Sequence, residues 1–377
     1  MFNMNPLSPL IFFFGKGMFR HALLIVGLSI ISWYLKIEGI NWAAYILWIS
    51  LILLATIIIW RAGDFFSSAA TYIQNKHEIP QSIKAAVIDA IASSFPEFCV
   101  AVIAVLLIGR AEVGISSIVG SALYNVLVIP AAAGLVATSP MVISKEVVWR
   151  DNIFYFGVVL LLGAMLWQFP NEWGAGVALL FLLAYIAYVV LLHRDFKKSR
   201  SQEKVKIINE EVEEDEEDLL ELKSEKKAWF WIMVMMFVMG GASHLLVESS
   251  LALGDLLGID GVIMGFVVIA AGTSVPDTAL SVISAKKGHY DAAVSNVFGS
   301  NIFDICVCLS IPIFIALAMS GEPTYIDLPQ TGLIWSLIGA TLLAIYFFWS
   351  NNYTLTKFKA GIMGILYLLI VLISFTF

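Results

Sequence analysis

Two short segments of the chain combine a proline, a carboxylic acid and hydroxyl side chains within apolar sequence. The first reads Ser-Ser-Phe-Pro-Glu over residues 93–97, and the second reads Thr-Ser-Val-Pro-Asp over residues 273–277. A proline inside a helix leaves the carbonyl four residues earlier without its backbone donor. Each segment therefore offers a carboxylate, hydroxyls and free carbonyls, which are the oxygen ligands that hard cations such as Ca²⁺ prefer.

A second pair of similar segments follows at nearly the same distance. Residues 119–125 (Val-Gly-Ser-Ala-Leu-Tyr-Asn) match residues 298–304 (Phe-Gly-Ser-Asn-Ile-Phe-Asp). The offset is 180 residues for the first pair (273 − 93) and 179 for the second (298 − 119), with the order preserved. The segments therefore form an internal repeat. Neither motif contains His or Cys, which disfavours a soft metal as the transported ion.

The acids of these motifs are Glu97, Asp277 and Asp304, and no Lys or Arg lies inside the motif segments. Carboxylates that face one another repel unless cations or protons lie between them. An unpaired acid within a membrane is costly and functional by default. The acids therefore predict an antiporter whose site changes its access across the membrane only when it is filled with cations or protons. A single Ser or Asn in a membrane helix, by contrast, is more commonly a helix-packing contact.

The elements that carry these motifs are expected to be membrane-spanning helices. Of the 377 residues, 60% are apolar and 14% are charged, against about 25% charged in soluble domains. This composition excludes a soluble enzyme, a nucleic-acid binder and a disordered chain. Eleven stretches are long and apolar enough to cross a bilayer, roughly 18–36, 43–62, 82–108, 113–138, 152–169, 173–193, 228–253, 260–285, 290–319, 331–349 and 358–376.

The distribution of basic residues predicts the orientation of these spans. With the N-terminus in the cytoplasm, 20 of the 22 Lys and Arg residues fall in cytoplasmic loops, and only Lys36 and Arg110 fall outside. The C-terminus then lies outside, and the two repeats run in opposite directions, as in secondary transporters with a midplane site. We expect an all-α polytopic protein of the cell membrane with about eleven transmembrane helices, ten of them in two inverted five-helix repeats plus one extra N-terminal helix.

The chain divides into four predicted parts. These are an extra transmembrane helix (1–40), a first transmembrane half with repeat 1 (41–194), a cytoplasmic acidic linker (195–227) and a second half with repeat 2 (228–377). The acidic run Glu210–Asp218 lacks the turn glycine of a calcium-binding loop, which favours a solvated linker over a calcium sensor. The cysteines Cys99, Cys306 and Cys308 show no disulfide or zinc pattern and are interpreted as small buried apolar residues.

The two repeats resemble the alpha repeats of the sodium/calcium exchanger (calcium/cation antiporter) family. Gly-Thr-Ser-Val-Pro-Asp (272–277) with Gly-Ser-Asn-Ile-Phe-Asp (299–304) is close to the second repeat of the family, and residues 93–97 with 120–125 match the first. The pairing of Asn125 with Asp304 looks most like the potassium-dependent branch. The chain departs from the family in having Ala92 in place of a glycine and one extra residue near Gly109.

The resemblance implies Na⁺/Ca²⁺ antiport without a cofactor, with K⁺ co-transport left open. Glu97 and Asp277 would bind Ca²⁺ and Na⁺ alternately, completed by carbonyls near Ser93 and Thr273. The other implied site residues line sodium positions (Ser94, Ser121, Ser274 and Ser300) or flank the centre (Asn125 and Asp304). A Ca²⁺/H⁺ antiporter is the alternative and a channel or scaffold a third class, while no nucleophile–base pair or phosphate-binding loop indicates an enzyme.

Three further residues outside the motifs have candidate roles. Asp89 is either a cation relay at the inner vestibule or a solvated residue at the cytoplasmic mouth. Glu248 is a candidate lining residue of the outer access path. His244 occupies the position that Asp64 has in the first half and is either a pH sensor or, as we favour, a hydrogen-bonded core histidine.

Overall fold

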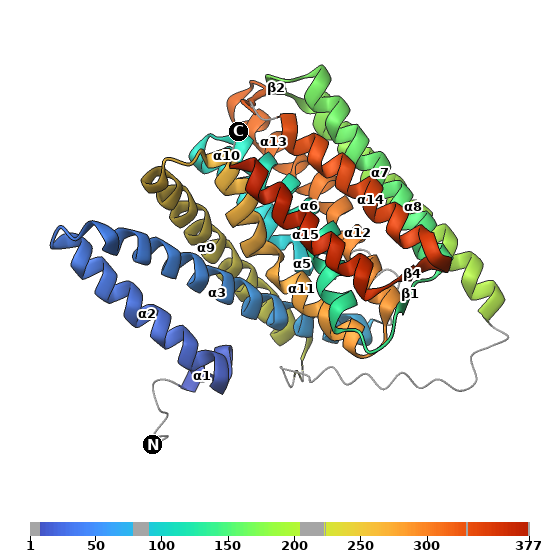
Figure 1. Ribbon diagram of the computed structural model, residues 1–377, viewed down its shortest axis with the longest axis horizontal. Helices are drawn as coiled ribbons and strands as arrows, with labels where there is room; N and C mark the ends of the chain where they lie inside the picture. The colour runs from blue at the N-terminus through green and yellow to red at the C-terminus, as the bar shows by residue number, and fades with distance from the viewer. Residues whose placement is uncertain (1–7, 78–89, 204–221, 223, 329–330, 376–377) are drawn as a thin grey trace.

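The structure is a computed structural model that describes residues 8–77, 90–203, 222, 224–328 and 331–375 and is almost entirely helical (Figure 1). Asp89 and the run Glu210–Asp218 lie outside the described residues. Within the described ranges, 10 helical segments are long and apolar enough to cross a membrane, and a shorter apolar segment covers Ser93–Ile108. Together they account for the eleven predicted spans and confirm the all-α polytopic fold.

The first half of the molecule contains five spans and is preceded by two further helices. The preceding helices are α1 (Ser8–Phe14) and α2 (Lys16–Ile37), and α2 packs along α3, where Ser29 Oγ lies 2.8 Å from Ser50 Oγ. The five spans are α3 (Asn41–Lys76), α5 (Ala90–Val102) with the π-helix η2 (Ile103–Ile108), α6 (Ala111–Val136), α7 (Lys145–Gln168) and α8 (Ala175–Glu203).

The second half repeats this order. Its elements are α9 (Glu225–Leu257), α10 (Gly261–Met264), the π-helix η3 (Gly265–Ile269), α11 (Ala270–Lys286), α12 (Tyr290–Phe303), the π-helix η4 (Asp304–Cys308), α13 (Ser310–Ser320), α14 (Thr331–Tyr353) and α15 (Lys357–Ser374). The extra residue predicted near Gly109 coincides with η2, because a π-helix accommodates one more residue per turn than an α-helix. Gly109 ends that segment with a φ of 71°.

Two short antiparallel ribbons show that the halves are inverted. β1 (Met141–Val142), from the first half, pairs with β4 (Thr354–Leu355), and β2 (Glu172–Trp173) pairs with β3 (Thr324–Tyr325). β1 and β3 follow the third span of their halves, whereas β2 and β4 follow the fourth. The repeat therefore maps one ribbon onto the other, and Figure 1 shows β2 and the β1–β4 pair at opposite ends of the molecule.

The end that carries β1 and β4 gathers loops that the sequence assigns to the cytoplasmic side. The backbone N–H of Ser144 donates to Asp291 Oδ1 at 2.6 Å, which joins the α6–α7 and α11–α12 connections. At the same end, Lys359 Nζ donates to the backbone carbonyls of Phe347, Ser350 and Thr354 at 2.8–3.0 Å. The Ser144–Asp291 contact joins segments that are far apart in the sequence, whereas the Lys359 contacts are local to the α14–α15 connection.

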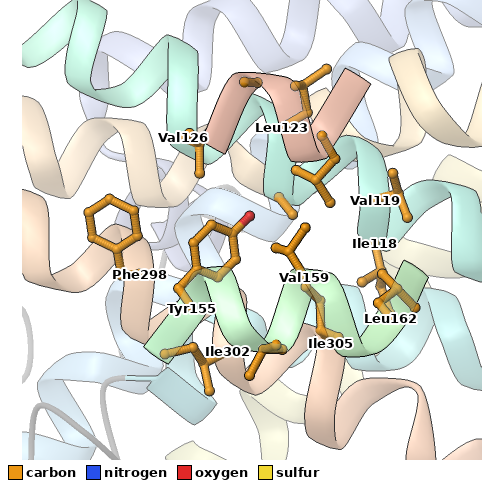
Figure 2. Packing of buried hydrophobic residues seen from close by; sticks show 14 of the residues in the cluster. Ile118, Val119, Leu123, Val126, Tyr155, Val159, Leu162, Phe298, Ile302 and Ile305 are labelled. Atoms are coloured by element: carbon orange, nitrogen blue, oxygen red, sulfur yellow. The ribbon is translucent and has the colours of Figure 1, made fainter. Parts of the chain in front are cut away.

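Helix α6 forms the centre of the bundle. In its most apolar window 78% of the residues are buried, against 17% for α15 at the periphery. Figure 2 shows Leu123 and Val126 of α6 packed near Tyr155 and Val159 of α7 and Phe298 of α12. An apolar shell of this kind raises the cost of any uncompensated charge within it.

Candidate cation site

The ten residues predicted to form the site are all buried, none with more than 6% of its surface exposed: Ser93, Ser94, Glu97, Ser121, Asn125, Thr273, Ser274, Asp277, Ser300 and Asp304. They come from four helices, because α5 and α6 carry the first repeat and α11 and α12 with η4 carry the second. Both proline-containing helices continue through their prolines, Pro96 in α5 and Pro276 in α11. The carbonyls of residues 92 and 272 thus lack their helical donors.

Serine pairs connect the two repeats in a reciprocal pattern. Ser94 Oγ of repeat 1 lies 2.8 Å from Ser300 Oγ of repeat 2. The equivalent residues, Ser274 and Ser121, lie 2.9 Å apart with the repeats exchanged. This correspondence places α5 against α12 and α11 against α6 around one common centre.

The same serines hold the carboxylates. Ser121 Oγ donates to Glu97 Oε1 at 3.4 Å, and Ser300 Oγ donates to Asp277 Oδ2 at 3.2 Å. Each serine therefore contacts an acid of its own repeat and a serine of the other. The hydroxyls orient the two carboxylates toward the interface between the repeats.

Four side-chain oxygens of the site are buried and make no hydrogen bond to any described residue: Glu97 Oε2, Asn125 Oδ1, Asp277 Oδ1 and Asp304 Oδ2. They come from both repeats. Within the part of the chain that the structure describes, none of the three acids forms an ion pair. Buried acceptors without donors are expensive to maintain, which makes these four oxygens candidate cation ligands.

An amide pair fixes which atom Asn125 presents to this centre. Asn301 Nδ2 faces the backbone carbonyl of Ala122 at 3.2 Å, and a carbonyl can only accept a hydrogen bond. Asn301 Oδ1 must then accept, and it does so from Asn125 Nδ2 at 2.9 Å. Asn125 Oδ1 is thereby left facing away from Asn301 as an available oxygen ligand.

A thiol that the sequence analysis did not assign to the site lies beside Asp304. Cys308 Sγ lies 3.8 Å from Asp304 Oδ1 and 3.8 Å from the backbone oxygen of Ser94. Its spacing of four residues from Asp304 places the two side chains on one face of a helix, and that signal is present in the sequence. Asn301 was visible in the motif, but its contact with Asn125 depends on how α6 and α12 pack.

His244 and Glu248 lie on α9 and form a pair rather than separate features. The His244 Nε2 atom is 3.3 Å from Glu248 Oε1, and the side chains are 44% and 61% exposed. The interpretation of His244 as a core histidine is therefore wrong, because one end of its ring faces an exposed acid. The neighbouring Ser243 is buried, and its hydroxyl donates to the carbonyl of Pro96 at 3.5 Å.

The sequence matches the family model described as sodium/calcium exchanger protein over residues 47–193 and 227–376. The chain belongs to the sodium/calcium exchanger family. The two matched blocks correspond to the two five-span halves, and the N-terminal helices and the acidic segment lie outside them. The exchanger is therefore an integral membrane antiporter of the cation-exchanging type rather than an enzyme.

Curated relatives of the exchanger come from bacteria and animals. The inner membrane protein YrbG of Escherichia coli (strain K12) is 27% identical over 277 residues, covering 72% of this chain and 80% of YrbG. The sodium/potassium/calcium exchanger 5 of Homo sapiens is 26% identical over 390 residues, covering 80% of this chain and 77% of that protein.

Solved structures show the same fold. The H⁺/Ca²⁺ exchanger CAX superposes with a TM-score of 0.68 at 16% identity, covering 95% of this chain and 89% of CAX. The sodium-calcium exchanger NCX_Mj superposes with a TM-score of 0.57 at 19% identity, covering 87% of this chain and 98% of the NCX_Mj chain. The fold thus accommodates both proton-coupled and sodium-coupled exchange.

Proposed function

We propose that the protein exchanges Na⁺ for Ca²⁺ at a midplane site between the two repeats. The observation that supports this most directly is the set of four buried, unpartnered oxygens on Glu97, Asn125, Asp277 and Asp304. Carboxylate and amide oxygens are ligands for Ca²⁺ and are also suited to Na⁺. Three acids without a basic partner make the empty site unstable in the bilayer, so that reorientation requires a bound cation.

In this proposal the residues have distinct roles. Glu97 and Asp277 bind Ca²⁺ and Na⁺ alternately, with main-chain carbonyls near Ser93 and Thr273 completing the Ca²⁺ shell. Ser94, Ser121, Ser274 and Ser300 line Na⁺ positions and orient the acids through the contacts described above. Asn125 and Asp304 flank the centre. Because the name of a human relative includes potassium, K⁺ co-transport is part of the test below.

The topology is likewise part of the proposal. We propose that the β1–β4 end faces the cytoplasm, because the basic connections meet there, so that the N-terminus is cytoplasmic and the C-terminus outside. The proposed parts are then an extra span (1–40), two inverted halves (41–194 and 228–377) and a cytoplasmic linker (195–227). A reporter fused to the C-terminus that is active only outside the cell checks this orientation, and a cytoplasmic C-terminus contradicts it.

A proton-coupled exchanger is the second candidate, favoured by the similarity in fold to CAX, an H⁺/Ca²⁺ exchanger. Radioactive Ca²⁺ uptake into proteoliposomes, with Na⁺, K⁺ and pH gradients imposed one at a time, separates the two. We expect an outward Na⁺ gradient at fixed pH to drive uptake. Uptake that follows an imposed pH gradient and ignores Na⁺ contradicts the first proposal and establishes the second.

Replacing Asn301 by alanine is expected to weaken Ca²⁺ binding without removing a ligand. The substitution leaves Asn125 free to rotate its amide, and loss of such an orienting partner typically lowers metal affinity by about 10- to 100-fold. We expect the apparent Ca²⁺ affinity in the flux assay to fall by roughly tenfold, with the maximal rate less affected.

A double-mutant cycle distinguishes this orienting role from general damage. Asn125→Asp has two equivalent oxygens, so that its orientation no longer requires Asn301. We expect Asn301→Ala to have little further effect on Ca²⁺ affinity in the Asn125→Asp background. Equal losses in both backgrounds contradict the orienting role.

A further inference from the structure

The thiol of Cys308 occupies a position at the cation site that an oxygen-only exchanger does not need. The residue is fully buried, at the end of η4. Its Sγ atom is 3.8 Å from both Asp304 Oδ1 and the backbone oxygen of Ser94. The other oxygen of Asp304, Oδ2, is buried and makes no hydrogen bond to a described residue. A soft donor thus lies beside one oxygen of a carboxylate whose other oxygen has no partner among the described residues.

We propose that Cys308, Asp304 and the Ser94 carbonyl form a coordination site for a thiophilic divalent cation, such as Cd²⁺ or Zn²⁺, which blocks the exchanger. The inference rests on the proposed function in that Asp304 is shared with the Ca²⁺ site. Ca²⁺ gains little from sulfur because it prefers oxygen ligands. The thiol therefore gives a soft cation an interaction that the transported ions lack.

The distances suit such a site without large movement of the backbone. A zinc ion bonds to sulfur at about 2.3 Å and to carboxylate oxygen at about 2.1 Å. Bonds of those lengths to two atoms 3.8 Å apart enclose an angle of about 120°, within the range of a distorted tetrahedral centre. The same angle applies to the Ser94 oxygen, and water completes the shell. The thiol releases its proton to water as the metal–sulfur bond forms.

The other two cysteines do not share this position. Cys306 is a free cysteine buried on the same π-helix, two residues from Cys308. Cys99 is half-buried and faces α9, where a Cβ placed on Gly240 would lie 3.8 Å from its sulfur. Serine substitutions of these two residues are therefore matched controls.

A small pocket of about 10 Å³ lies against the thiol. It is lined by Ala101, Gly114, Cys308 and Thr324 among others. Thr324 belongs to β3 at the end opposite β1 and β4. Because this end is external in the proposed orientation, we expect Cd²⁺ to act from outside the cell.

The first test is inhibition of Na⁺-driven Ca²⁺ uptake by Cd²⁺ in proteoliposomes. We expect the wild type, Cys99→Ser and Cys306→Ser to be inhibited at similar Cd²⁺ concentrations. Cys308→Ser is expected to transport Ca²⁺ normally and to require at least about tenfold more Cd²⁺, because losing a direct ligand costs at least as much as losing a supporting one. Equal inhibition of Cys308→Ser and the wild type overturns the proposal.

The second test detects the metal–sulfur bond without transport. Cd²⁺ bound to a thiolate gives an ultraviolet charge-transfer absorption that Ca²⁺ does not give. We expect this band in the purified wild type and Cys306→Ser, and its loss in Cys308→Ser. A band that persists in Cys308→Ser but disappears in Cys99→Ser overturns the assignment. If the band behaves as expected while no Na⁺-driven uptake occurs, the thiol site stands and the proposed exchange activity fails.

Discussion

Glu97→Gln is expected to abolish Ca²⁺ exchange while leaving the protein folded. Glutamine retains the shape of the side chain and an oxygen that accepts from Ser121, but it removes one charge from the cation shell. A buried charge interaction of this kind is worth about 3–5 kcal/mol, which corresponds to at least about a hundredfold loss of affinity. We expect Na⁺-driven Ca²⁺ uptake below detection, and the same result for Asp277→Asn.

The thermal stability of this variant separates loss of function from misfolding. In the absence of cations, removing one of three facing acids lowers their mutual repulsion, so we expect a higher unfolding temperature for Glu97→Gln than for the wild type. Ca²⁺ should raise the unfolding temperature of the wild type but not of the variant. Glu322→Gln, an exposed acid near β3, is the matched control and should retain transport. Normal uptake by Glu97→Gln contradicts the proposed site.

Gly120→Ala is expected to be the most damaging substitution outside the charged residues. A Cβ at Gly120 would lie 2.0 Å from the backbone oxygen of Phe266 and 2.8 Å from the Cβ of Ala270. Because the first obstacle is backbone, α6 must move away from η3 and carry Ser121 with it. Overpacking of this severity costs about 3 kcal/mol or more. We expect a lower yield of monodisperse protein in detergent and a lower unfolding temperature.

The equivalent glycine in the second repeat provides the control. A Cβ at Gly299 would meet only the Tyr188 hydroxyl, at 3.8 Å, among the described residues. Alanine is also favoured over glycine inside a helix, by about 0.5–1 kcal/mol. Gly299→Ala should therefore fold as well as the wild type. Equal stability of the two variants contradicts the close packing of α6 on η3.

The candidate site residues were chosen from few alternatives in the sequence, and the structure buries all ten of them. Only three acids lie deep in apolar spans of the repeats, and the matching offsets pair Glu97 with Asp277 and Asn125 with Asp304. The eleven spans followed from apolar length alone, since a bilayer leaves few other solutions. The sequence also predicts where the helices lose a backbone hydrogen bond, namely at Pro96 and Pro276.

What the sequence did not predict depends on how separate helices meet. The Ser94–Ser300 and Ser121–Ser274 pairs join residues more than 150 positions apart, and no periodicity reports such contacts. The amide pair of Asn125 and Asn301 arises in the same way. The His244 interpretation was wrong because hydropathy describes a helix as a whole and does not tell which face is covered.

The exchange of partners between the two strand ribbons has a consequence for energetics. The repeat maps the β1–β4 ribbon onto the β3–β2 ribbon. We therefore expect the states open toward the two sides of the membrane to use equivalent contacts, with the two halves exchanging roles. Two states built from equivalent contacts lie close in free energy. The ribbons of the proposed exchanger therefore favour neither side of the membrane, so that the ion gradients set the direction of exchange.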